Sequence, residues 1–203
     1  MRLPCLILCC LFIAGCDNSP APYTLPHGPT PWLAVHPDTE SMYAADVQLG
    51  GVPGLTWTGD LKAALRWAEE ENKLVLVEWT AVTNTKCAVV HRQLFPKAPI
   101  RQALRPYILV MLYADVVPNE FYKQPPPKDE GRRDGEANYR LERDTTYTAA
   151  LPLYAILKPI RQGKGQMLAT FEGVLEFDNS ANAYVYHERE FLAFLQRRQL
   201  NPR

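Results

Sequence analysis

A single cysteine stands where a strand delivers the chain into a helix, a position at which thiol chemistry is common. Residues 74–79 read LVLVEW, a short apolar run typical of a buried strand, and the residues after Asn84 have the pattern of a helix. Cys87 would lie in the first turn of that helix, where the helix dipole and free N–H groups stabilise a thiolate. A paired thiol would stand three residues earlier, at Asn84. The sequence therefore indicates either a thiol site that lacks its partner or a buried, inert cysteine.

Two titratable side chains lie close to this cysteine along the chain. Glu78 interrupts the apolar strand nine residues before Cys87. His91 follows Cys87 by four residues, so one helix face would carry both, and the imidazole could pair with a thiolate or act as a base. The alternatives are structural: a glutamate at a polar strand edge, and a histidine beside a small buried residue.

The N-terminus predicts the compartment. Met1-Arg2 precedes an apolar stretch, residues 3–14, that is too short to span a bilayer of roughly 30 Å but suits a secretory signal. It ends in Ile-Ala-Gly-Cys, which resembles the bacterial lipobox, in which the cysteine is diacylated and becomes the new N-terminus; the alternative is an ordinary signal cleaved nearby. Because two or three acyl chains anchor stably, we expect a lipoprotein held in the membrane through Cys16. It would face the periplasm or the outer side of the cytoplasmic membrane.

The predicted processing leaves one thiol. Cys5, Cys9 and Cys10 leave with the signal peptide, and Cys16 becomes a thioether. Cys87 is then the remaining free thiol of the mature chain, and no intramolecular disulfide is predicted.

Composition and motifs argue against several classes of function. Lys plus Arg and Asp plus Glu both number 22, so no basic excess points to nucleic acid. No phosphate loop, nucleophile elbow or dinucleotide fingerprint is present, and we predict no cofactor. We predict no metal site either, because the four histidines show no metal-ligand spacing: His27, His36, His91 and His187.

The elements expected along the chain alternate between helix and strand. Asp60 suits the N-cap of an amphipathic helix over 61–71. The strand at 74–79, the helix after Asn84, a helical turn at 98–104 and a second buried strand at 107–114 follow. The C-terminal part predicts a short helix at 138–147, a strand at 151–157, its hairpin partner near 167–173 and a last amphipathic helix at 188–200. Such an order predicts a layered α/β fold.

The domain organisation follows from proline content and patterning. We expect residues 1–15 to be the signal peptide, 16–54 a lipidated N-terminus and flexible tether, and 55–203 one domain. Within that domain, residues 115–148 are expected to form a loop insertion, with an exposed stretch before the short helix. Long loops of this kind are usually functional lids or disordered segments.

Three motifs in this order resemble the thioredoxin superfamily over about residues 60–200. They are VLVEWTAVTNTKC, HRQLFPKAPIRQALRPYILVMLYADV and ALPLYAIL. The chain is most similar to periplasmic thioredoxin-like domains related to the C-terminal domain of the transmembrane thiol–disulfide reductase. The resemblance implies a three-layer α/β fold with a central mixed sheet flanked by helices.

The resemblance also assigns roles to single residues. Pro152 matches the family's cis-proline, which places the backbone of Leu151 where an extended substrate can pair with it; the alternative is a trans proline opening an edge strand. Glu78 matches the buried acid that relays a proton to the second cysteine. Cys87 matches that second, resolving cysteine, and Asn84 replaces the nucleophile. Because an amide cannot attack sulfur, dithiol exchange is expected to be lost.

Two functions remain open at this level. In the first, a groove formed by Trp79, residues 81–87 and Leu151-Pro152 binds an extended peptide or protein partner in the cell envelope. In the second, Cys87 acts as a monothiol that reduces a disulfide or a peroxide, with Glu78 and His91 as proton carriers.

Overall fold

The computed structural model describes residues 32–33, 42–44, 46–48, 52–161 and 163–197. The predicted signal peptide and Cys16 lie outside the described residues. None of the helices in the described ranges is long and apolar enough to cross a membrane.

A six-stranded mixed sheet forms the centre of the molecule, in the order β1-β6-β5-β3-β4-β2. Strands β2, β3 and β4 run parallel, whereas β5 is antiparallel to β3, β6 to β5 and β1 to β6. The bounds are β1 Trp32–Leu33, β2 Trp57–Thr58, β3 Leu74–Thr80, β4 Tyr107–Tyr113, β5 Leu153–Ile160 and β6 Lys164–Phe171.

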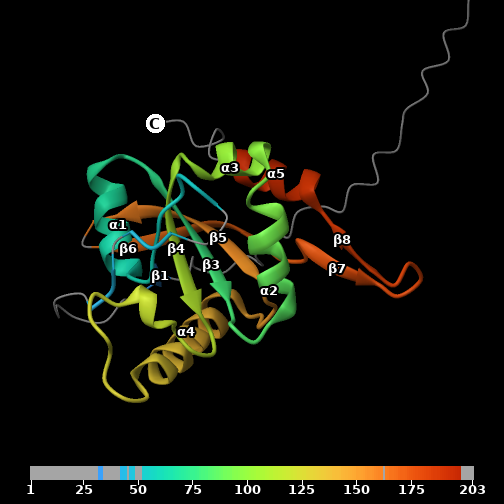
Figure 1. The fold of residues 1–203 in the computed structure, drawn as a ribbon. Coiled ribbons are helices and arrows are strands. Elements are labelled where there is room, and N and C mark those ends of the chain that lie inside the picture. The colour runs from blue at the N-terminus through green and yellow to red at the C-terminus, as the bar shows by residue number, and fades with distance from the viewer. Residues whose placement is uncertain (1–31, 34–41, 45, 49–51, 162, 198–203) are drawn as a thin grey trace, which may run out of the picture.

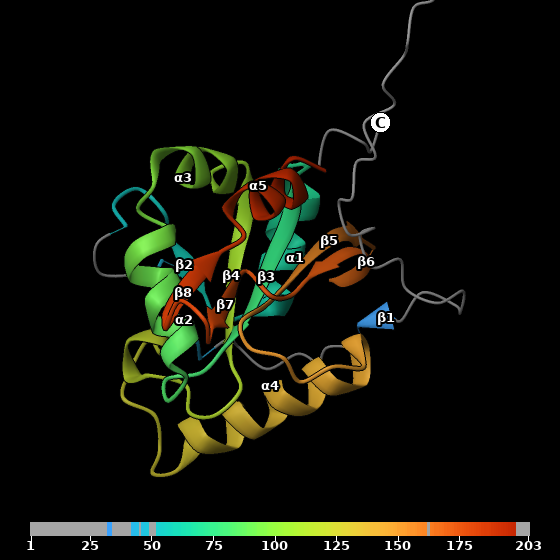
Figure 2. The same ribbon diagram turned by 90° about the vertical axis from the view of Figure 1, so that its right-hand side faces the viewer.

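Helices cover both faces of this sheet, as Figures 1 and 2 show. Helix α1 (Leu61–Glu70) and helix α4 (Glu130–Thr146) both contact one hydrophobic core. Leu65 of α1 belongs to this core, and Leu141 of α4 packs against it. The other core takes apolar side chains from α2 (Thr85–Val89), the π-helical turn η1 (Val90–Leu94), α3 (Ala98–Leu104) and α5 (Glu188–Gln196). The predicted three-layer α/β class, with a central mixed sheet flanked by helices, is confirmed.

The strongly patterned elements were predicted well. Asp60 caps α1 by accepting a hydrogen bond from Ala63 N at 2.8 Å. The central strand β3 alternates between the two cores: Val77 and Trp79 lie in the α1 core, and Leu76 lies in the other. Because both faces of β3 are covered, its sequence is apolar except at Glu78 and at Thr80, its last residue.

The region 115–148 differs from the prediction of a loop insertion with a short helix at 138–147. Helix α4 begins at Glu130 and spans 17 residues, so it is the connection between β4 and β5; only the stretch before it, with the short 3₁₀ turn η2 (Asn119–Phe121), is irregular. The helix approaches the backbone closely, because a Cβ on Gly135 would lie 2.1 Å from the Asp115 carbonyl oxygen. Glycine, asparagine and threonine form much of its inner face, so the sequence showed little apolar periodicity there.

Packed residues also begin before residue 55, the predicted start of the domain. Val47 and Val52 are buried, and Val47 forms an isolated β-bridge with Trp57. Tyr43 stacks on Tyr122 with ring centroids 5.3 Å apart, and both hydroxyls donate to Asp134 on α4. Val47 and Val52 each stand singly among polar residues, glycine and proline, so no period revealed them.

A second sheet was not predicted. Strands β7 (Leu175–Asp178) and β8 (Ala183–Tyr186) form an antiparallel hairpin between β6 and α5. Its strands are only four residues long, too short for clear alternation. A hydrogen bond joins the hairpin to η1: the Tyr186 hydroxyl donates to the Gln93 side chain.

Candidate functional site

A buried carboxylate lies at the centre of the candidate site. Glu78 is 0% exposed, and its Oε1 lies 2.7 Å from His91 Nε2 and accepts a hydrogen bond of 3.3 Å from the Tyr154 hydroxyl. Three elements supply these groups: β3, η1 and β5. The alternative reading of Glu78, as a glutamate at a polar strand edge, is therefore excluded, because its carboxyl is buried.

His91 is the basic partner of this carboxyl group. Burial by itself would lower the pKa of His91, but the negative charge and hydrogen bond of Glu78 raise it above its usual value. The side chain of His91 is 16% exposed, so the imidazole connects solvent to the buried carboxylate. Its ring stacks on Phe95, with centroids 5.3 Å apart. The pairing predicted between His91 and the Cys87 thiolate is not seen, because the imidazole binds Glu78 instead.

The Cys87 thiol is enclosed. It is 1% exposed, and burial followed by the negative charge of Glu78 raises its pKa to about 11, although hydrogen bonding with Thr80 and Ala81 opposes the shift. A thiol with this pKa is protonated at neutral pH and is a poor nucleophile. These surroundings favour the reading of Cys87 as a buried structural residue.

Asn84 caps the helix that carries Cys87. Its side-chain oxygen accepts hydrogen bonds from Lys86 N at 2.9 Å and from Cys87 N at 3.4 Å. These are the helix-start amides that would stabilise an anion at this position. The Asn84 side chain therefore occupies the backbone N–H groups that would otherwise stabilise a thiolate.

A residue that sequence reasoning missed holds the loop before Asn84. Asp115 follows β4, and its carboxylate accepts hydrogen bonds of 3.0 Å from Val82 N, Thr83 N and the Thr83 hydroxyl. Burial alone would raise the pKa of Asp115, but the hydrogen bonds from Thr83, Val116 and Val82 lower it below its usual value. An acid directly after an apolar strand was the available signal, because neighbouring parallel strands end at the same edge of the sheet.

Leu151 and Pro152 lie beside this loop. Their peptide bond is cis, Pro152 is buried and Leu151 is partly exposed. Because Trp79 pairs with Leu153 in the β3–β5 register, the two residues continue alongside the end of β3. In the loop that follows β3, Val82 is 56% exposed.

Trp79 does not belong to this surface. Its side chain is 0% exposed and packs in the core beneath α1, on the face of the sheet away from Cys87 and His91. The predicted role of Trp79 in lining a groove for an extended partner is therefore wrong. A strand with two covered faces gives no sequence signal for which face a particular side chain occupies.

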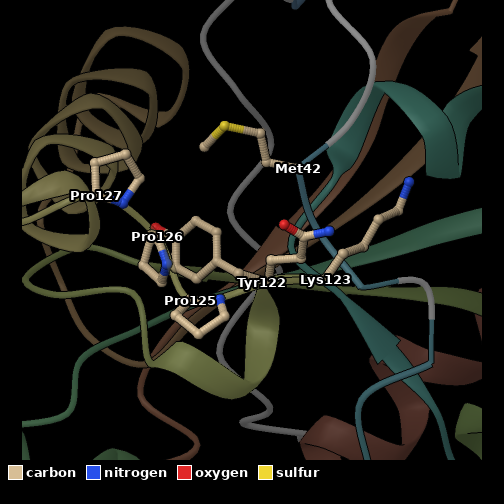
Figure 3. A pocket seen from close by; sticks show the side chains of 7 residues that line it. Met42, Tyr122, Lys123, Pro125, Pro126 and Pro127 are labelled. Carbon is tan, nitrogen blue, oxygen red and sulfur yellow. The ribbon is translucent and has the colours of Figure 1, made fainter.

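A pocket elsewhere contains none of the predicted site residues. It has a volume of about 370 Å³, and Figure 3 shows the Tyr122 ring beside Pro125 and Pro126 on its wall. Met42, Lys123, Gln124 and Pro127 complete the lining. Proline and aliphatic side chains dominate this lining and offer little acid–base chemistry.

Solved structures with similar folds include a thioredoxin from Thermus thermophilus, at 14% identity and a TM-score of 0.47 over 70% of this chain and 85% of that one. A thioredoxin from Trichomonas vaginalis matches at 16% identity and a TM-score of 0.34, over 57% of this chain and 80% of that one. DsbH oxidoreductase matches at 16% identity and a TM-score of 0.42, over 68% and 81%.

Sequence comparison assigns the family. No curated protein gives a significant match to the chain. The family profile described as Thioredoxin-like matches residues 56–159, just over half of the 203 residues, and this range contains β2 to β5 with Glu78, Asn84, Cys87 and Pro152. The chain belongs to the thioredoxin-like family.

Proposed function

We propose that this chain is an exported thioredoxin-like protein with a degenerate Asn-x-x-Cys site, which binds an extended partner and does not perform dithiol exchange. One observation carries the proposal: Asn84 caps the helix at the nucleophile's position, while Cys87 is enclosed and has a pKa of about 11. Exchange needs one thiolate that attacks the substrate disulfide and a second that releases it. With Asn84 in the first position, the attacking sulfur is missing.

The surface that remains suits recognition of an extended chain. Asp115 fixes the backbone of residues 82 and 83, so the loop is ordered before a partner arrives. Exposed Val82, just after β3, and partly exposed Leu151, just before β5, offer apolar contact. The resemblance to the periplasmic domain of the transmembrane reductase supports a partner in cell-envelope thiol–disulfide systems.

The proposed location is the outer side of a membrane. It rests on the sequence of residues 1–16, whose lipobox-like end would make Cys16 the acylated N-terminus.

Insulin reduction tests the loss of exchange. In the presence of dithiothreitol we expect the wild-type protein to give no acceleration over the uncatalysed reaction. Asn84→Cys should form an 84–87 disulfide on oxidation and should accelerate reduction, because Glu78 and Cys87 already stand in the family's positions. Thr83→Cys is the matched control, since it adds a thiol one residue away with the wrong spacing. Catalysis by the wild type would overturn the proposal.

Partner binding needs its own measurement. A photoreactive amino acid at Val82 should crosslink a partner in intact cells, and the same group at Val185, which is similarly exposed on β8, should not. Equal crosslinking from both positions would show that the surface beside Leu151 is not selective.

Monothiol catalysis by Cys87 is the second function that the sequence left open, and the site does not favour it. At a pKa of about 11, roughly one thiol in ten thousand is ionised at pH 7. We expect iodoacetamide to label Cys87 slowly until the protein is unfolded in urea; rapid labelling of the native protein would revive this alternative.

A further inference from the structure

Apolar side chains that reach solvent follow the end of the sheet at the candidate site. Val82 comes after β3, Val116 comes after β4 and Leu151 comes before β5. Because β4 is parallel to β3 and β5 is antiparallel to it, all three residues lie just beyond the same end of the sheet. Val82 and Val116 are neighbours, since both backbone N–H groups donate to Asp115 Oδ1, and their exposed fractions are 56% and 46%.

Tyr147 lies at the β6 side of this end of the sheet. The next residue, Thr148, donates from its hydroxyl to Glu172 Oε2 at 3.3 Å. Glu172 directly follows β6, whose last residue, Phe171, pairs with Tyr154 at the start of β5. Strands β6 and β4 are three spacings apart in the sheet, so their ends lie roughly 14 Å from each other, a distance that four or five residues of an extended chain can span.

The backbone of Tyr147 has a conformation that costs free energy for a tyrosine. Its φ is +59°, in the left-handed region that glycine adopts without strain, and it ends α4 with its N–H donating to the Arg143 carbonyl. The other non-glycine residues with positive φ in the described ranges are Asn72, Asp129 and Asn182, whose short polar side chains favour this region. A bulky residue kept at a position that suits glycine points to a use of its side chain outside the fold.

The Tyr147 side chain and the carboxylate beside it are both open to solvent. Tyr147 is 77% exposed, the largest value among the exposed large hydrophobic side chains of the described residues. Glu172 is exposed and forms no ion pair within the described part of the chain, and Arg143, one turn before Tyr147, is paired with Asp144. An aromatic face and an unpaired carboxylate within one residue of each other suit a cation, because the ring quadrupole and the negative charge both attract it.

We propose that Tyr147 and Glu172 bind a basic side chain of the extended partner, an arginine or a lysine that stacks on the ring and pairs with the carboxylate. This inference rests on the proposed function, which places an extended chain beside Val82 and Leu151. It adds a requirement on the sequence of the partner. Apolar residues should contact Val82 and Leu151, and a basic residue should stand within about three positions of them.

Random dodecapeptides displayed on phage and selected on the full-length protein supply the probe. We expect the retained peptides to carry arginine or lysine close to apolar residues and to lose binding to Val82→Asp. Fluorescence anisotropy of one retained peptide should show binding weakened about fivefold by Tyr147→Gly and about threefold by Glu172→Gln. A peptide whose basic residue is replaced by glutamine should bind Glu172→Gln and the wild type equally.

Two controls separate a contact from a structural role. Tyr139 is another exposed tyrosine of α4 and lies within the regular helix, so Tyr139→Ala should leave peptide binding unchanged. Tyr147→Gly should raise the urea midpoint of unfolding, because glycine relieves the left-handed φ. A lower midpoint would show that Tyr147 supports the fold and would overturn its assignment as a contact.

The failure of this inference and that of the proposed function give different results. Peptides that require Val82 but bind Tyr147→Gly and Glu172→Gln as tightly as the wild type would overturn the contact with a basic residue alone. A selection in which the wild type retains no peptide that Val82→Asp releases would overturn both.

Discussion

Two glutamates are completely buried in the described part of the chain, and they differ in whether they have hydrogen-bond partners. Glu78 on β3 has His91 and Tyr154 as partners for Oε1. Glu142 on α4 is also 0% exposed, yet neither of its carboxyl oxygens has a hydrogen-bond partner in the described part of the chain. Burial raises the pKa of Glu142 to about 7, with no charged neighbour contributing.

This difference in hydrogen-bond partners shows what a buried carboxyl needs in order to carry a charge. A buried carboxylate is tolerated when a cation and hydrogen bonds compensate for lost hydration, and an uncompensated one keeps its proton instead. The candidate site therefore holds a carboxyl that is hydrogen-bonded to a histidine, whereas α4 holds a carboxyl that is neutral below about pH 7. Four experiments test whether the two buried carboxyls differ in this way.

Removing the paired carboxyl should have the largest effect. Glu78→Ala leaves the His91 imidazolium and the Tyr154 hydroxyl without their partner, so at pH 6 we expect a loss of about 3 kcal/mol in the free energy of unfolding by urea. Glu142→Ala is the matched control, because it makes the same truncation without stranding a partner. Equal losses in the two variants would show that the pairing of Glu78 contributes little.

The unpaired carboxyl should produce a pH dependence of stability. The folded-state pKa of Glu142 lies above the ordinary value of 4.5, so the folded state keeps a proton that the unfolded chain releases. The free energy of unfolding should therefore fall by about 2 kcal/mol as pH rises from about 4.5 to 7.

Two variants separate this effect from other titrations. Glu142→Gln should abolish the fall below about pH 6.5, while Glu136→Gln, which alters an exposed carboxyl on the same helix, should keep it. The raised pKa of His91 also reduces stability at higher pH, but only as pH rises above about 6.5. An unchanged profile in Glu142→Gln would contradict the assignment.

Loss of the helix cap at Asn84, a neutral residue, should reduce the free energy of unfolding less than the loss of Glu78. Asn84→Ala removes the cap of α2, and we expect a loss of about 1 kcal/mol in the free energy of unfolding. Asn84→Asp should keep most of that stability, because a carboxylate also accepts from the helix-start amides. If Asp destabilised as much as Ala, the hydrogen bonds of the cap would not be the cause.

The smallest expected effect is on the thiol. Glu78→Gln removes a negative charge near Cys87, so the pKa of Cys87 should fall from about 11 but remain above neutrality, because burial is the larger cause. The pH dependence of iodoacetamide labelling measures this change. Glu142→Gln should leave it unaltered, since Glu142 does not contribute to the pKa of Cys87; an equal change in both variants would mean that a general loosening of the fold exposes the thiol.

The elements with strong periodicity were predictable from the sequence, and those whose buried faces are polar were not. The apolar runs of β3, β4 and β5 and the capped helix α1 were found because one or both faces exclude water. Helix α4 was placed too short, since its inner face uses Gly135, Asn138 and Glu142 in place of apolar residues.

The residues of the candidate site also fall into some that were predictable from the sequence and some that were not. Glu78, Asn84 and Cys87 were recognisable because local spacing carries them. Asp115 and the pairing of His91 with Glu78 were not, because residues that meet across strands leave no local pattern.

The covalent possibilities follow from the sequence: an amide at position 84, a thiol at position 87, and no second thiol in the predicted mature chain. The tertiary structure decided whether that thiol is available. Solvation and nearby charge set a pKa, and only packing brings Glu78, Thr80 and the surrounding apolar side chains around Cys87. The same packing gave Glu78 a partner and left Glu142 without one.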